Sequence, residues 1–196
     1  MNRTLVETIT KVTLPKELVQ LFADPPLVGN EKREDYDQVF SAIVDALQPT
    51  EKILWFLVKD LADLTWDIVR ERKVKVYIIR SFEIVAVEEA LASSDALGLG
   101  SDVEARQWAT DPKMRIKIDK KLLAAGFSSS EIQAKAFIRG GREIDIIDRR
   151  IATYELRRMA ILRQIEEYNG KRARQLERAS SQIIEGEFSD GSEKSQ

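Results

Sequence analysis

Five aspartates on two predicted helices have residue types and spacing that could do chemistry. Asp60, Asp63 and Asp67 are three and four residues apart and share one face of a helix, as do Asp145 and Asp148. Carboxylates from two helices can hold Mg²⁺ and activate a water molecule, which is the chemistry of a carboxylate-dependent hydrolase. Such spacings are also common in charged helices, where basic side chains pair with the acids. We therefore assign no catalytic residue, metal ligand or cofactor, and keep a magnesium-dependent hydrolase as a second alternative.

The 196 residues include no histidine and no cysteine. This composition excludes catalytic triads built on imidazole, thiolate nucleophiles, histidine-bearing zinc sites and disulfides. An enzyme would have to work with carboxylates, Lys, Arg, Tyr or Ser alone. We therefore expect a protein that is not an enzyme.

Basic side chains gather in the helix predicted after residue 139. They are Arg149, Arg150, Arg157, Arg158, Arg163, Lys171, Arg172, Arg174 and Arg178. With the short helix and the glycine pair before it, this segment resembles a helix-turn-helix reading head. Acids interleave with the bases as far as Glu167, and the net charge of -2 creates no general attraction for polyanions. The basic residues are therefore candidates for contact with a partner, which is either a protein or a nucleic acid.

The composition and periodicity predict an all-α protein. The charged share is 33%, and only 9 glycines and 5 prolines interrupt the chain, which is typical of long charged helices. Apolar residues recur at offsets of three and four from residue 31 until Pro49. No Gly or Pro occurs between residues 51 and 92, so this stretch forms one long helix or two with a break. Within it, the alternation from Val74 to Ile79 would suit a strand, but no partner strand is predicted, so we expect helix.

The predicted organisation has four parts. Residues 1–30 form an N-terminal arm with a short helix from Lys16 to Phe22, and residues 31–138 form a helical core. Residues 139–180 form a long charged C-terminal helix, and residues 181–196 form an acidic tail. The tail has too little apolar area to offset the entropy of ordering, so we expect it to be disordered.

Local signals predict several helix ends. Ser101 with Glu104, and Ser128 with Glu131, fit the capping-box pattern that opens a helix. The pair Gly140-Gly141 predicts a hinge or a tight turn before the C-terminal helix.

Two helices carry the apolar surface that must be buried. The first half of the helix after residue 51 is apolar on two sides, including Trp55 and Trp66, and therefore predicts a central helix packed on both. The C-terminal helix has an apolar stripe at heptad-like spacing from Ile144 to Tyr168, interrupted by Arg158. We expect its first turns to pack within the chain. Beyond Leu162 we expect it to project as a coiled-coil-like arm that self-associates or binds a partner.

The sequence predicts no membrane association. No stretch approaches the roughly 18 uninterrupted apolar residues of a membrane span, and the first 15 residues lack the apolar run of a secretory signal. We therefore expect a cytoplasmic protein.

Two segments resemble a set of uncharacterised bacterial proteins. Those proteins share a P-L-V-x-G…Y-D segment and a helix with the pattern V-x-D-x-x-D-L-x-W-[DE]-I-x-R-x-R. The matching residues here are Pro26, Leu27, Val28, Gly29, Tyr36, Asp37, Val58, Asp60, Asp63, Leu64, Trp66, Asp67, Ile68, Arg70 and Arg72. The chain departs from the pattern in two places: Gly29 follows Val28 directly, and Glu71 replaces an apolar residue between the two arginines. The resemblance implies no known activity, cofactor or partner. It does imply that Asp60, Asp63, Asp67, Arg70 and Arg72 form a structural charge signature, with acids and guanidinium groups pairing inside the fold.

These observations favour a non-enzymatic helical interaction or accessory protein. The first alternative is a nucleic-acid-associated protein that uses the basic C-terminal helix. Heparin retention that falls with salt would favour this alternative, and a magnesium-dependent thermal shift would favour the hydrolase.

Overall fold

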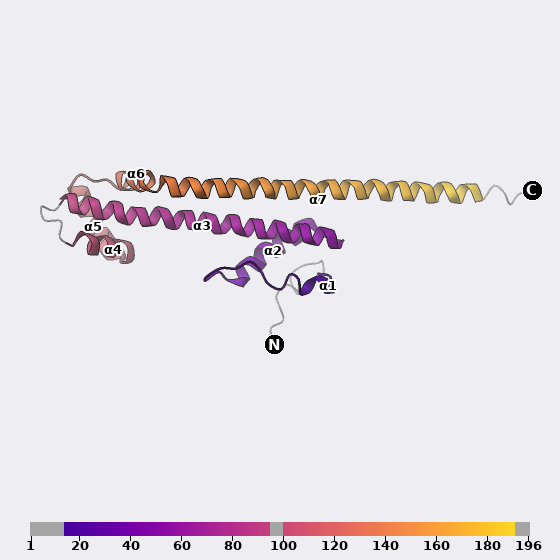
Figure 1. Ribbon diagram of the computed structural model, residues 1–196, viewed down its shortest axis with the longest axis horizontal. Coiled ribbons are helices and arrows are strands. Elements are labelled where there is room, and N and C mark those ends of the chain that lie inside the picture. The colour runs from indigo at the N-terminus through magenta and orange to yellow at the C-terminus, as the bar shows by residue number, and fades with distance from the viewer. Residues whose placement is uncertain (1–13, 95–99, 191–196) are drawn as a thin grey trace, which may run out of the picture. The chain divides into compact units, whose positions relative to one another are not determined.

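All seven elements in the described part of the chain are α-helices, which confirms the predicted fold class (Figure 1). The computed structural model describes residues 14–94 and 100–190, with side chains as far as residue 180. The helices are α1 (Lys16–Val19), α2 (Arg33–Leu47), α3 (Lys52–Ser94), α4 (Ser101–Thr110), α5 (Pro112–Ala124), α6 (Ser129–Arg139) and α7 (Gly141–Asp190). No helix in these ranges is both long enough and apolar enough to cross a membrane.

The chain divides into two compact units. Met1–Trp66 and Tyr154–Gln196 form the first, and Asp67–Thr153 form the second, so α3 and α7 each contribute a segment to both. The four-part organisation stays a prediction, since it divides the chain into consecutive segments, whereas each compact unit is defined by its internal contacts. The predicted disorder of the tail concerns residues whose side chains, from 181, and backbone, from 191, lie outside the description.

In the first unit, the opening turns of α3 are buried on two sides, as the paired apolar stripes predict. One side packs against α1 and α2 and buries Leu18, Tyr36, Phe40, Val44, Trp55, Val58, Ala62 and Trp66. The other side, with Leu54 and Leu61, packs against Ile165 of α7. The spacing of three and four residues places each stripe on its own face of the helix.

The predicted projection of the C-terminal helix beyond Leu162 is wrong. Ile165 is only 3% exposed, because it fills the space between Leu54 and Leu61. Tyr168 packs against the same cluster, and Arg158 is partly buried in the stripe. The second apolar stripe of α3 needs a cover, and the stripe of α7 supplies it within the chain.

The second unit has a core of its own around the last turns of α3. The buried residues are Ala86, Val87, Ala90, Leu91, Ala105, Trp108, Ile118, Leu122 and Ile132, contributed by α3, α4, α5 and α6. The alanines lack bulk and so let the neighbouring helices approach closely. In this unit Ile144 and Ile147 of α7 are also buried, as predicted for the start of that helix.

Of the two predicted capping boxes, one is formed. The Ser128 side chain accepts a hydrogen bond from the backbone of Glu131, whose carboxylate accepts one from the Ser128 backbone at 2.7 Å. The helix α4 instead begins after Gly100, which is its N-cap at φ 82°, so Ser101 lies inside the helix and the predicted box is wrong. The residues from Val74 to Ile79 are helical, as expected.

The glycine pair forms a tight turn, which is one of its two predicted roles: Gly140 is the turn residue after α6, and Gly141 is the first residue of α7. Gly140 has φ -81° and ψ 3°, which other residues also adopt. A Cβ at Gly140 would lie 2.7 Å from Cδ2 of Phe82 on α3, whereas one at Gly141 would meet nothing within 4 Å. Gly140 is therefore required because the backbone lies against an aromatic ring.

Candidate partner-binding surface of the C-terminal helix

Asp63, one residue of the predicted charge signature, accepts hydrogen bonds from two side chains inside the first unit. Its Oδ1 accepts a hydrogen bond of 2.6 Å from the hydroxyl of Tyr36, and Lys59 Nζ donates to both of its oxygens at 2.7 and 2.6 Å. Burial raises the pKa of Tyr36 above its ordinary value, and the hydrogen bond to Asp63 raises it further. The phenol therefore stays protonated and acts as a donor to the carboxylate.

A second contact joins the same two segments. The indole N–H of Trp66 donates to Glu31 Oε2 at 2.9 Å, and the backbone N–H of Val28 donates to the same oxygen at 3.1 Å. The rings of Tyr36 and Trp66 meet edge to face with centroids 5.9 Å apart. The motif segments that are distant in sequence therefore form one structural cluster.

Glu31 and Lys59 are members of this cluster that the sequence interpretation missed. The i,i+4 spacing of Lys59 and Asp63 is a signal that could have identified the lysine. Glu31 offers no such signal, because its partner Trp66 is 35 residues away in the chain.

The rest of the charge signature does not converge on one site. Asp67 pairs with Arg70 one turn later at 2.5 Å. Asp60 is exposed, and Arg72 is exposed but not without a partner. On α7, Asp148 pairs with Lys75 at 2.7 Å, and Asp145 is exposed. Across residues 14–94 and 100–180, no three or more acids come together as ligands for a metal ion.

Four of the nine basic candidates on α7 are engaged within their own unit. Arg150 approaches Glu71 at 3.5 Å, and Arg172 pairs with Glu51 at 2.9 Å and donates to Thr50 at 2.6 Å. Arg149 Nε donates to a backbone carbonyl at 3.2 Å, and Arg158 is partly buried in the apolar stripe. These four side chains support the fold of their own unit.

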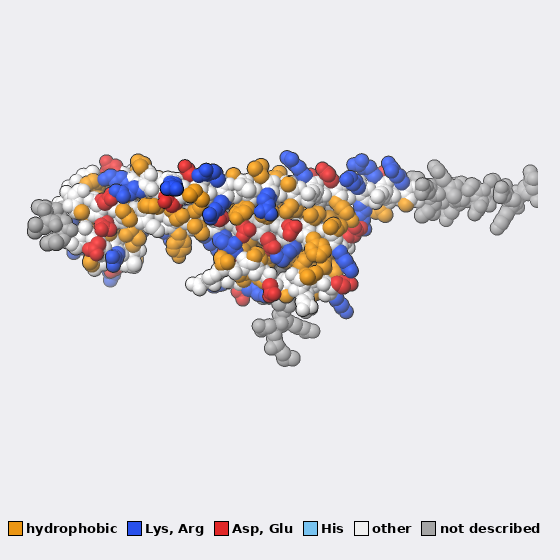
Figure 2. Space-filling model, in the orientation of Figure 1, with side chains coloured by type: hydrophobic (Ala, Val, Ile, Leu, Met, Phe, Trp, Pro, Cys, Tyr) orange, Lys and Arg blue, Asp and Glu red, His pale blue; other side chains and the backbone are white. Residues whose placement is uncertain are grey.

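Four of the other five basic candidates lie free on the first unit, between residues 157 and 174. Arg157, Arg163, Lys171 and Arg174 are exposed, and none makes an ion pair with any residue of the described ranges. At 100° per residue they fall in a sector of about 120° that points away from Ile165. Figure 2 shows Lys and Arg side chains in blue along α7 up to the part drawn in grey.

Two apolar side chains accompany these cations: Leu156 lies inside their sector, and Met159 borders it. Leu156 is 73% exposed and Met159 is 47% exposed, on the side of α7 opposite the buried stripe. We call the set Leu156, Arg157, Met159, Arg163, Lys171 and Arg174 the outer face of α7. Glu167 lies in the same sector, so four cations less one carboxylate give this face a charge of about plus three.

The outer face therefore combines uncompensated positive charge with exposed apolar groups, which is the chemistry of a surface that binds an acidic partner. It takes up about 26 Å of helix between Arg157 and Arg174. Arg and Met are also enriched in protein interfaces relative to other surfaces. Comparison of the chain with known protein families, with curated proteins and with solved structures finds no match.

Proposed function

We propose that this is a non-enzymatic interaction protein of the cytoplasm, which binds an acidic protein partner through the outer face of α7. The observation that carries the proposal is the presence of Leu156 and Met159 beside four cations without an acid partner in the described chain. A large side chain such as Leu156 gains about 1.5–3 kcal/mol when it is fully buried. The surrounding cations would orient an acidic surface over it.

The pairing of the aspartates supports the non-enzymatic part of the proposal. Asp63 is held by Tyr36 and Lys59, and Asp67 by Arg70, so these carboxylates already have protein partners. Their contacts give each a role in stabilising its own unit.

Nucleic acid is the second candidate, and the row of cations favours it. Arg157, Arg163, Lys171 and Arg174 lie on one face over about 26 Å, a length over which DNA presents many phosphates. The two candidate functions differ in the role of Leu156 and Met159. A protein partner would bury these side chains, whereas contacts with phosphates do not require exposed apolar side chains.

The test compares two double charge reversals of equal size. Arg163→Glu with Lys171→Glu changes the outer face, and Lys117→Glu with Lys120→Glu changes exposed residues of α5 in the other unit. Each is titrated with duplex DNA and single-stranded RNA at several salt concentrations, and each is used to capture proteins from nuclease-treated extract of the native host. The proposal expects an acidic protein that is retained by wild type and by the α5 variant but lost from the α7 variant.

Leu156→Ser separates the candidates further. It should weaken capture of a protein partner about tenfold or more, since the loss of a buried leucine exceeds 1.4 kcal/mol. Nucleic-acid binding that falls with salt and is unchanged by Leu156→Ser would support the second candidate instead. Absence of both a protein partner and nucleic-acid binding would reject both.

A further inference from the structure

A groove in the second unit has the composition of a small-molecule site. It lies between α3 and the pair formed by α4 and α5 and has a volume of about 700 Å³. Its lining includes Tyr77, Arg80 and Glu83 from α3, with Trp108 from α4 and Arg115 from α5. Sites for small ligands commonly have volumes of about 300–1,000 Å³ and combine apolar walls with a few polar groups.

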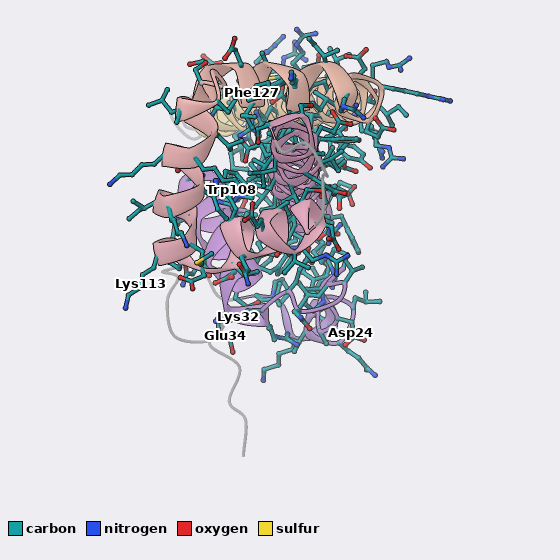
Figure 3. All side chains as sticks on the ribbon, turned by 90° about the vertical axis from the view of Figure 1, so that its left-hand side faces the viewer. Asp24, Lys32, Glu34, Trp108, Lys113 and Phe127 are labelled. Atoms are coloured by element: carbon teal, nitrogen blue, oxygen red, sulfur yellow. The ribbon has the colours of Figure 1, made fainter. Side chains whose placement is uncertain are left out.

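One wall of the groove is held in place by two contacts. The Trp108 indole N–H donates to Asp119 Oδ1 at 2.7 Å, and the side chain is only 7% exposed. The Arg115 guanidinium lies 4.5 Å from the centre of the Trp108 ring, in a cation–π contact. Figure 3 shows Trp108 among the helices of this unit, whereas Lys113 on α5 points outward. The tryptophan therefore presents the guanidinium of Arg115 at a defined place.

The lining of the groove has a net positive charge, because it contains two arginines and one acid. Arg80 and Arg115 make no ion pair within the described ranges, and Glu83 is the acid in the lining. Elsewhere in the same unit, Lys121 pairs with Glu104 at 2.7 Å, so cations there do have acids in reach. Two guanidinium groups can bind one oxyanion through several N–H donors.

An aromatic surface lies open beside these cations. Tyr77 is 73% exposed, although it belongs to the lining of the groove. An exposed ring next to uncompensated guanidinium groups can stack on a planar ligand while the arginines bind its charge. The cation–π contact with Trp108 accounts for the position of Arg115, whereas no ion pair or ring contact within the described ranges occupies the ring of Tyr77 or the guanidinium of Arg80.

We propose that this groove binds a small aromatic oxyanion, with its ring against Tyr77 and its carboxylate or phosphate between Arg80 and Arg115. Guanidinium groups recognise both kinds of anion, so the shared chemistry is a planar ring carrying an oxyanion. The site lies in Asp67–Thr153, whereas the outer face of α7 lies in the other unit. The proposal therefore stands independently of the interaction function.

Isothermal titration calorimetry of the full chain tests the proposal with four probes. Adenosine monophosphate and indole-3-acetate carry a ring and an oxyanion, adenosine carries the ring alone, and inorganic phosphate carries the anion alone. At least one of the first two should bind with a Kd below about 1 mM, and the last two should bind at least about tenfold more weakly. Binding of adenosine monophosphate alone identifies a phosphate ligand, and binding of indole-3-acetate alone identifies a carboxylate.

Variants assign the binding to the groove. Arg80→Ala and Arg115→Ala should each raise the Kd about tenfold or more, whereas Lys113→Ala should leave it unchanged. If the Arg115→Ala variant loses its helical circular dichroism, the Kd of the Arg80→Ala variant alone tests the proposal, because Arg80 is exposed. The proposal is overturned if neither aromatic oxyanion binds below about 1 mM, if adenosine binds equally well, or if Arg80→Ala binds like wild type.

Discussion

The hydroxyl of Tyr36 donates a 2.6 Å hydrogen bond to Asp63, a residue on the next long helix, while Lys59 donates to the same carboxylate from one turn away. Tyr36 is only 3% exposed, so a buried aromatic ring reaches a partly exposed acid at the edge of the core. This contact joins α2 to α3 and gives Asp63 a structural role. It also makes the stability of the first unit sensitive to two specific changes.

Tyr36→Phe should lower the free energy of unfolding by about 1.5–3 kcal/mol, the range for a hydrogen bond to a charged group. The ring and its packing remain, so the loss reports the hydroxyl. Urea unfolding at pH 7 measures the change. Combining Tyr36→Phe with Asp63→Asn should cost less than the sum of the two single changes, and strict additivity would show that the contact does not contribute.

The raised pKa of Tyr36 predicts a loss of stability in alkali. Below about pH 10, the tyrosine is protonated in both the folded and the unfolded chain. Above that pH the unfolded chain releases the proton while the folded chain retains it, so unfolding becomes more favourable. Urea unfolding at pH 9, 10 and 11 should show a smaller decline for Tyr36→Phe than for wild type. Equal declines in both proteins would mean that Tyr36 ionises as freely in the folded chain.

Gly140→Ala should destabilise the second unit by about 1–3 kcal/mol, because its Cβ would lie 2.7 Å from the Phe82 ring. Gly141→Ala is the matched control, since its Cβ meets nothing within 4 Å, and it should be neutral or stabilise the helix slightly. Thermal and urea unfolding of both variants decide the point. Equal effects of the two substitutions would mean that the contact with Phe82 is not tight.

Ile165→Asp should unfold the first unit or destabilise it by several kcal/mol, because it places a charge among Leu54 and Leu61. Leu176→Asp, on the same helix but at a position 61% exposed, should change the free energy of unfolding by less than about 0.5 kcal/mol. Circular dichroism during urea titration compares them. A folded Ile165→Asp variant of normal stability would restore the projecting arm that the sequence predicted.

The apolar periodicity predicted the helices well, because apolar residues recur every three or four positions along them. The buried Trp55 and Trp66 and the two-sided packing of α3 follow from the same pattern. Which segment packs against each apolar stripe was harder to predict. Ile165 offered the same heptad spacing whether its partner was α3 or a second chain, and only the complementary stripe of α3 decides between them.

The candidate site was predicted in part. The sequence identified the basic residues of α7 but could not separate Arg172, which pairs with Glu51, from Arg174, which is exposed and free of ion pairs in the described chain. That separation depends on which way each side chain faces after α7 packs on α3. The roles of Glu31 and Gly140 depend on contacts across tens of residues, for which local spacing carries no signal.

Site-specific photo-cross-linking in the native host shows whether a protein partner covers the outer face of α7. A photoreactive amino acid replaces Met159 on the outer face or, as control, Lys117 on α5, where both side chains are exposed. We expect an adduct from position 159 that is sensitive to protease but not to nuclease, and that disappears when Arg163→Glu and Lys171→Glu are added. An adduct destroyed by nuclease, or equal adducts from positions 159 and 117, would contradict the account.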